Sequence, residues 1–238
     1  MKIKEYKINF IKSLLPFYDE MEAESFFYLI LENKHQLRRI DLALDVDKEF
    51  SEDDISIWNV ILEKLKTQIP IQYILGTTHF YSSEFIVDEN VLIPRTETEI
   101  TVLEVIKYIK SNFEKGSEIK IADICTGSGA ILIAIVNELN KEYKFKLIAS
   151  DISNEALVVA NDNFKTYDLD VKIYCGDLIK PLIENKVEVD IVVSNPPYIG
   201  VNNFVEDIVV ATEPKLALFG GEEGYEIYFD FFEQLKIY

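Results

Sequence analysis

Residues 119–139 have the sequence IKIADICTGSGAILIAIVNEL, and this stretch decides the fold class. Its first part, residues 119–124, is a short apolar run typical of a strand that is buried on both faces. Gly127 and Gly129 then allow a tight turn. The apolar residues that follow Gly129 predict a helix that begins at once. A strand that passes through glycines directly into a helix is typical of an α/β sheet.

The same alternation continues along the chain. We expect further strands at residues 146–150, 171–175 and 189–194, and a second helix after Ser153. Strands that alternate with helices predict a doubly wound, mostly parallel sheet. The ligand of such a sheet lies beyond the carboxyl ends of the strands, where the strand order reverses.

The sequence before this sheet divides into two segments. Residues 1–68 show apolar residues at helical spacing and predict a small helical domain. Within it, Ser51 precedes three acidic residues, which is the pattern of an N-cap. We expect the helix after this cap to bury one face, made of Ile57, Val60, Ile61 and Leu65.

Residues 69–95 are rich in β-branched and aromatic residues and predict a connector with a short β-hairpin that turns at Ser82-Ser83. The remaining residues, 96–238, then carry the predicted sheet.

Composition limits the class of protein. The chain has 238 residues and a formal net charge of −18, which argues against a broad surface for the phosphates of a nucleic acid. Two cysteines cannot form a disulfide framework, so a reducing compartment is expected. No apolar run has the length of a membrane span, and the first residues lack the apolar core of a signal peptide. These features predict a cytoplasmic protein.

The ends of the first three predicted strands carry a possible nucleoside site. The glycines at 127 and 129 open a helix N-terminus to a carboxylate or phosphate, although a strand–helix turn can need glycine for its own sake. Asp151 stands where an acid accepts hydrogen bonds from ribose hydroxyls, and it could equally cap the next helix. Asp177 could accept from an exocyclic amine and Leu178 could pack on its ring, although Gly-Asp is also a common turn. Together they predict an adenosine site, and without a phosphate-binding lysine they argue against a nucleotide triphosphatase.

The segment after the fourth predicted strand, SNPPY at residues 194–198, is the most specific feature. Two adjacent prolines fix the backbone and leave the Pro196 carbonyl free to accept a hydrogen bond. Asn195 offers both an acceptor and a donor, which suits a planar –NH₂ group, and Tyr198 offers a flat face. The alternative is a rigid turn with an asparagine cap.

These motifs resemble those of the S-adenosylmethionine-dependent methyltransferases that act on planar nitrogens. The segments PIQYILG (70–76), VLIPRTETE (91–99) and EPKLALFGGEEG (213–224) resemble the HemK-type peptide-chain-release-factor glutamine methyltransferases in particular. The resemblance implies a class I, Rossmann-like methyltransferase domain behind a helical substrate-docking domain. It also implies S-adenosylmethionine as cofactor and the glutamine of the Gly-Gly-Gln loop of bacterial class-I release factors as substrate.

The resemblance also implies site residues. The cofactor-binding residues by motif are Cys125, Thr126, Gly127, Ser128, Gly129, Asp151, Asp177, Leu178 and Asn195. The residues implied for the glutamine are Asn195, Pro196, Pro197 and Tyr198. We expect the Asn195 side-chain oxygen and the Pro196 carbonyl to accept the two N–H groups of the glutamine amide.

Three features depart from the pattern of the family. Cys125 stands where the family often has the first glycine of the loop, so positive φ would strain it. Thr96 replaces the second proline of the IPRPETE segment. The family continues with further strands after a helix such as YEIYFDFFEQL, whereas this sequence stops at Tyr238, which leaves its fourth strand as an expected edge.

Other functions remain open from the sequence. Methylation of a glutamine in a ribosomal protein keeps the same chemistry, and a shortened, non-catalytic protein that binds cofactor or partner is the other alternative. No Cys/His cluster has metal-ligand spacing, so no metal is expected. We expect a monomer without direct contacts to nucleic acid or membrane. Cys125 and Cys175 should lie too far apart to form a disulfide.

Overall fold

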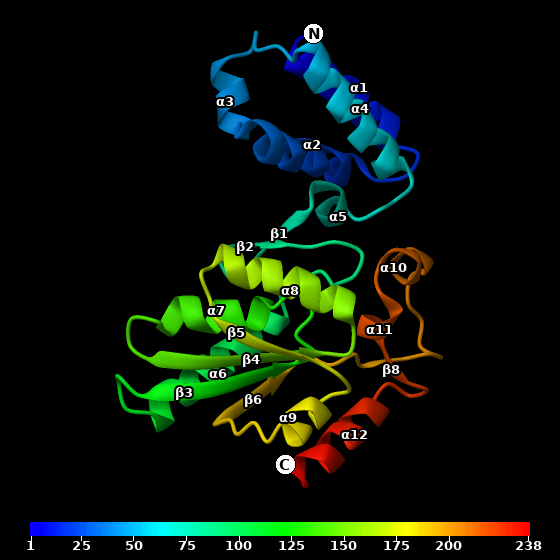
Figure 1. Cartoon of the computed structure of the whole chain (residues 1–238). Helices are drawn as coiled ribbons and strands as arrows, with labels where there is room; N and C mark the ends of the chain where they lie inside the picture. Colours follow the sequence, from blue (N-terminus) through cyan, green and yellow to red (C-terminus); the bar gives the residue numbers. More distant parts are fainter. The chain divides into compact units, whose positions relative to one another are not determined.

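The computed structural model describes all residues, 1–238, as two compact units, Met1–Leu75 and Gly76–Tyr238 (Figure 1). The first unit is helical and comprises α1 (Ile3–Leu14), α2 (Glu20–His35), α3 (Arg39–Leu44), α4 (Glu52–Lys66) and α5 (Ile71–Leu75). Its core surrounds Trp58, which is fully buried. The Trp58 ring packs at centroid distances of 4.9–5.7 Å against the rings of Tyr6, Phe10, Phe27 and Phe50.

Helix α4 confirms the predicted cap and, of the predicted buried face, Ile61 and Leu65, but not Ile57 and Val60. The Ser51 hydroxyl accepts from the Asp54 N–H at 3.1 Å, and the Asp54 carboxylate accepts from the Ser51 N–H, which makes a capping box. The buried side chains are Trp58, Ile61 and Leu65, whereas Ile57 and Val60 are half or more exposed. The prediction of Ile57 and Val60 was wrong because it left out Trp58, whose large apolar surface turns the helix towards the core.

The second unit begins with the hairpin of β1 (Thr77–Phe80) and β2 (Ser83–Ile86). The turn lies at Tyr81-Ser82, not at Ser82-Ser83, because Ser83 already pairs with Phe80. Both turn residues have positive φ, 46° and 62°, as a two-residue hairpin turn of the primed type requires.

The central sheet is parallel, with strand order β5-β4-β3-β6. Its strands are β3 (Glu118–Ile124), β4 (Lys144–Asp151), β5 (Val171–Cys175) and β6 (Ile191–Ser194). All four agree with the expected strands to within a few residues. Because β4 lies between β3 and β5, Cys125 and Cys175 follow strands that are not neighbours, and both cysteines are free.

Helices cover both faces of this sheet (Figure 1). One face packs against the hairpin and against α6 (Thr98–Asn112), α7 (Ala130–Leu139) and α8 (Asn154–Thr166). The other face packs against α9 (Lys180–Glu184) and α12 (Glu226–Leu235). Alternate residues of β3 serve the two cores, with Ile119 and Ile121 in the first and Ala122 and Ile124 in the second.

After β6 the chain forms several short helices and strands beyond the carboxyl end of the sheet (Figure 1). It contains β7 (Ile199–Gly200), α10 (Asp207–Thr212), α11 (Lys215–Leu218) and β8 (Phe219–Gly221). Strands β7 and β8 pair in parallel. No helix in the structure has the length and apolar character needed to cross a membrane.

Asn163 of α8 joins the hairpin to the loop that follows β3. Its side chain is fully buried and accepts from the Ile86 N–H at 2.7 Å. Its Nδ2 donates to the Ile86 and Ser128 carbonyls, both at 2.9 Å. A single amide therefore satisfies three backbone groups that belong to segments far apart in sequence.

Replacement of Asn163 by alanine is expected to destabilise the second unit by about 3 kcal/mol, because buried backbone groups would lose their partners. Urea unfolding followed by circular dichroism measures this loss, and faster hydrogen exchange at the Ile86 amide would localise it. Asn161→Ala is the matched control on the same helix, since Asn161 is only half-buried and makes no hydrogen bond of this kind. An equal effect in both variants would contradict the role of Asn163.

Candidate active site

The strand order reverses between β3 and β6, and the carboxyl ends of these two strands lie side by side. The chain runs from β3 outward to β4 and β5, and returns to the other side of β3 as β6. Ile124 and Ser194 are in register, and the Ser194 hydroxyl donates to the Ile124 carbonyl at 2.6 Å. The glycine loop (residues 125–129) and the NPPY loop (residues 195–198) therefore start next to each other at the position where such sheets bind ligands.

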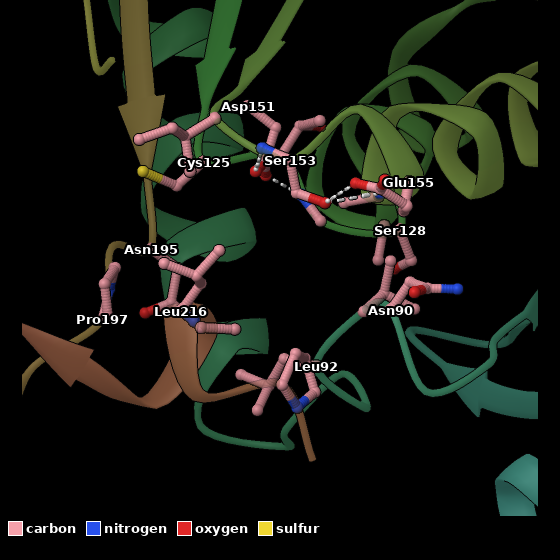
Figure 2. Close-up of a pocket in the computed structure, with 18 of the residues that line it drawn as sticks. Asn90, Leu92, Cys125, Ser128, Asp151, Ser153, Glu155, Asn195, Pro197 and Leu216 are labelled. Atoms are coloured by element: carbon pink, nitrogen blue, oxygen red, sulfur yellow. Dashed lines mark hydrogen bonds between the residues drawn. The ribbon is translucent and has the colours of Figure 1, made fainter. Parts of the chain in front are cut away.

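A cavity of about 420 Å³ opens at this point, a size in the range of small-molecule sites (Figure 2). Nine of the twelve predicted site residues line it: Cys125, Thr126, Gly127, Ser128, Asp151, Asp177, Leu178, Asn195 and Pro197. Gly129, Pro196 and Tyr198 are not part of the lining. Figure 2 shows Cys125 and Asp151 at one end of the site, and Asn195, Pro197 and Leu216 together at another.

The backbone conformation of the glycine loop explains why glycine stands at two of its positions. Gly127 and Gly129 have φ of 53° and 79°. A Cβ at Gly129 would also lie 2.6 Å from the Phe164 ring, so only glycine fits there. Cys125 has φ of 58° without being glycine, which confirms the strain expected at this departure from the family pattern. Burial raises the pKa of the Cys125 thiol to about 12, so it is not a thiolate nucleophile at neutral pH.

Asp151, at the end of β4, faces the cavity with an organised carboxylate. One oxygen accepts from the Gly127 N–H at 2.9 Å and the other from the Ser153 N–H at 3.0 Å. Burial nevertheless raises the pKa of this carboxyl above its usual value. Each oxygen keeps a further lone pair, so Asp151 can accept two more hydrogen bonds from a ligand.

Asp123 of β3 is a second acid near the site; it is not part of the cavity lining, and we assigned it no role from the sequence. It is fully buried, one oxygen accepts from the Thr126 hydroxyl at 2.7 Å, and the other oxygen has no partner. Burial raises the pKa of Asp123 to about 7, with a smaller contribution from the charge of Asp151. The signal available in the sequence was an acid inside an otherwise apolar strand.

Asp177 and Leu178 follow β5 and both line the cavity. One Asp177 oxygen accepts from the Lys180 ammonium and, at 3.4 Å, from the Gln234 amide. Leu178 has φ of 50°, and its carbonyl accepts from the buried Ser150 hydroxyl at 3.0 Å, which holds this strained residue in place.

Two glycines, one in β8 and one just after it, lie close against the backbone of the NPPY loop. A Cβ at Gly220 would lie 2.4 Å from the Pro197 carbonyl oxygen, and one at Gly224 would lie 2.4 Å from the Tyr198 carbonyl oxygen. These glycines therefore let two backbones approach more closely than any other residue would permit. Pro196 is buried, whereas the Tyr198 side chain is 57% exposed and outside the cavity.

Replacement of Gly220 by alanine is expected to displace the Pro197 carbonyl and to lower kcat/KM of the reaction at this site about 10- to 100-fold, because small shifts in a reacting geometry are costly. Steady-state kinetics of the variant measure this. Gly116→Ala is the control, since its Cβ would meet nothing within 4 Å. Gly116 has φ of 89°, so that variant should lose only about 1 kcal/mol of stability and keep its activity. Unchanged kinetics in Gly220→Ala would refute the tight fit.

Two walls of the cavity were not assigned from the sequence. The first is residues 89–98, which contribute Leu92, Pro94, Arg95 and Thr98 among others. The second is residues 214–219, which contribute Leu216 and Phe219. The second wall, and the first from Val91 on, fall within the segments that carry the family resemblance, and that was the signal that could have pointed to them.

An ion pair joins these two walls. Arg95 Nη2 lies 2.5 Å from Glu213 Oε1, and the Glu213 side chain is only 4% exposed. The second Glu213 oxygen is buried without a partner. Thr98 also contacts the NPPY loop, since its hydroxyl accepts from Asn195 Nδ2 at 3.2 Å.

Comparison with known proteins identifies the family. Residues 106–217 match the family described as Methyltransferase small domain, and residues 12–76 match the PrmC N-terminal domain. A release factor glutamine methyltransferase from Flavobacterium psychrophilum is 42% identical over 226 residues, which cover 92% of this chain and 76% of that protein. The chain belongs to the release factor glutamine methyltransferase family.

Other relatives agree with this membership. The release factor glutamine methyltransferase of Bacillus subtilis is 36% identical over 203 residues, 84% of this chain and 69% of that protein. Among solved structures, a ribosomal protein L11 methylase from Lactobacillus delbrueckii subsp. bulgaricus aligns with a TM-score of 0.40 and 20% identity, over 63% of this chain and 58% of that chain. The family-model match and the curated relatives confirm the predicted family and the predicted class I methyltransferase fold.

S-adenosylmethionine is the cofactor of this enzyme family, and the cavity has groups that suit each part of it. Helix α7 has no side-chain cap, and we propose that the N–H groups of its first turn donate to the carboxylate of the cofactor. The Asp151 carboxylate has lone pairs for the ribose hydroxyls. We propose that Asp177 accepts from the adenine amine and that Leu178 packs on the ring. The whole predicted set, including Cys125, Thr126, Ser128 and Asn195, stays a proposal for cofactor binding.

Proposed function

We propose that this chain methylates the side-chain amide nitrogen of the glutamine in the Gly-Gly-Gln motif of bacterial class-I peptide chain release factors. The observation that carries this proposal is the position of Asn195, whose carboxamide lines the cavity beside the glycine loop. The family is shown to be that of release factor glutamine methyltransferases, which supports the substrate. A ribosomal-protein glutamine and a non-catalytic role are not favoured, because the relatives carry the release factor name.

The chemistry required of the chain follows from the substrate. S-adenosylmethionine supplies an electrophilic methyl group when it is bound. The nitrogen of an amide is a weak nucleophile because its lone pair is delocalised into the carbonyl. The residues of the site therefore contribute by orienting the amide and by stabilising the positive charge that develops on its nitrogen.

Two acceptors of the NPPY loop can do this. The Asn195 side-chain oxygen makes no hydrogen bond within the chain, and neither does the Pro196 carbonyl. We propose that these oxygens accept the two N–H groups of the glutamine amide. Pro197 lines the cavity. We propose that the ring of Tyr198, which is exposed outside the cavity lining, packs on the amide plane of the glutamine as it enters.

The remaining parts of the proposal concern the setting of the reaction. We propose that the helical unit docks the release factor, because a protein substrate needs more contacts than one glutamine side chain provides. We also propose that the enzyme acts as a monomer in the cytoplasm, without direct contact to nucleic acid. A net charge of −18 supports the last point.

The test is methyl transfer from S-adenosylmethionine with a labelled methyl group to a purified bacterial class-I release factor. Mass spectrometry of the modified peptide is expected to place one methyl group on the glutamine of Gly-Gly-Gln. The control is the same release factor with this glutamine changed to alanine, which should accept no label. Label on another residue, or none on the wild-type release factor, would contradict the proposal.

A further inference from the structure

Asn195 has one side-chain hydrogen bond, and it comes from outside the NPPY loop. Its Nδ2 donates to the Thr98 hydroxyl at 3.2 Å, across 97 positions of sequence. The prolines that follow fix the backbone of the loop but leave the side-chain torsions of Asn195 free. Thr98 is therefore the group that holds the carboxamide in one orientation.

Thr98 is itself held in place. It is the first residue of α6, and its N–H donates to the Arg95 carbonyl at 3.0 Å, which closes a turn over residues 95–98. The Arg95 side chain pairs with the buried Glu213. The Arg95 side chain is partly exposed, but Glu213 is buried, so separating the two charges would leave an uncompensated carboxylate in the interior.

We infer that Thr98 is a positioning residue, which orients the Asn195 carboxamide while the Arg95–Glu213 ion pair anchors the turn that carries it. With Nδ2 bound to Thr98, the Asn195 oxygen is the group left without a partner and directed to the substrate. The inference rests on the proposed function for its catalytic consequence. Its structural content, the restriction of Asn195 by Thr98, can be measured without any substrate.

The experiment compares Thr98→Val, which keeps the shape but removes the hydroxyl, with Thr98→Ser, which keeps the hydroxyl. The valine variant is expected to lower kcat at least 10-fold, because one acceptor of the amide loses its orientation. Its affinity for S-adenosylmethionine, measured by calorimetry, should stay within 2-fold. The serine variant should recover most of kcat. Thr101→Val, one turn further along α6, is the matched control and should leave kcat unchanged.

Two further measurements distinguish a positioning role of Thr98 from a general loss of structure in the variant. In an Asn195→Ala background, Thr98→Val should cause no further loss of kcat, because its effect passes through Asn195. The NMR signals of the Asn195 Nδ2 group, assigned by their absence in Asn195→Ala, report how ordered this side chain is. The order should fall in Thr98→Val and be kept in Thr98→Ser. This second measurement stands even if the release factor is not a substrate. Unchanged order with unchanged kcat in Thr98→Val, or equal losses in the serine and valine variants, would overturn the inference.

Discussion

Asn195→Ala is expected to lower kcat for methylation of the release factor about 100- to 1,000-fold, the usual cost of deleting one preorganised group that stabilises transition-state charge. The variant removes the oxygen that we propose as acceptor for the glutamine amide. Asn195 is one of the residues that we propose for cofactor binding, but the variant leaves the others untouched, among them Asp151 and Asp177, so the affinity for S-adenosylmethionine should change less than 3-fold. Single-turnover kinetics give the rate of transfer, and calorimetry gives the affinity.

Asn195→Asp gives the sharper comparison, because it keeps the shape and an acceptor oxygen. It replaces the Nδ2 donor to Thr98 by an acceptor oxygen and places a negative charge in the cavity that Asp151 also lines. We expect its kcat to fall as well, since the negative charge of the new carboxylate repels the carbonyl oxygen of the glutamine and the reversed hydrogen bond with Thr98 changes the orientation of the side chain. Loss of cofactor affinity together with loss of transfer in the alanine variant would show that Asn195 mainly holds the cofactor, and would contradict the proposed role.

The sheet could be predicted because its signals are local. Strand β5 was predicted with its observed bounds, since five successive residues carry the pattern. The same holds for the turn of the glycine loop. Gly127 and Gly129 have positive φ, and glycine is the residue type that adopts such angles without a steric cost. Such features depend on neighbours in sequence, and a single sequence contains those neighbours.

The parts that failed depend on contacts between distant segments. Nothing near Glu213 indicates that its carboxylate is buried, because the partner Arg95 lies 118 positions away. The role of Asn163 is hidden for the same reason, since it bonds to Ile86, 77 positions earlier. The spacing of apolar residues also does not show which of two possible faces of a helix is buried. For this reason Ile57 and Val60 were predicted in the core of the first unit, where Trp58 lies instead. The sequence therefore predicted the cavity residues that follow the strands of the sheet. It did not predict residues 89–98 and 214–219, which form two further walls of the cavity.

Asp123 is expected to make the second unit less stable as the pH rises from about 4 to 8. Its pKa is raised from 3.8 to about 7 in the folded chain, because the carboxyl is buried. Between these two values the folded state holds a proton that the unfolded state has released, so folding is favoured by acid. The contribution is fully present below the unfolded pKa and is lost as the pH passes through about 7. With about 1.4 kcal/mol for each pKa unit, the loss amounts to about 4 kcal/mol.

Asp123→Asn isolates this contribution, because asparagine cannot ionise and still accepts from the Thr126 hydroxyl. The free energy of unfolding of the variant minus that of the wild type should increase by about 4 kcal/mol between pH 4 and pH 8. Urea unfolding at a series of pH values provides both curves. Asp170→Asn removes one charge at an exposed position of the same unit and serves as the control for net charge. A difference that is flat with pH, or that falls as the pH rises, would show that Asp123 is ionised in the folded protein and that the glycine loop carries a buried negative charge.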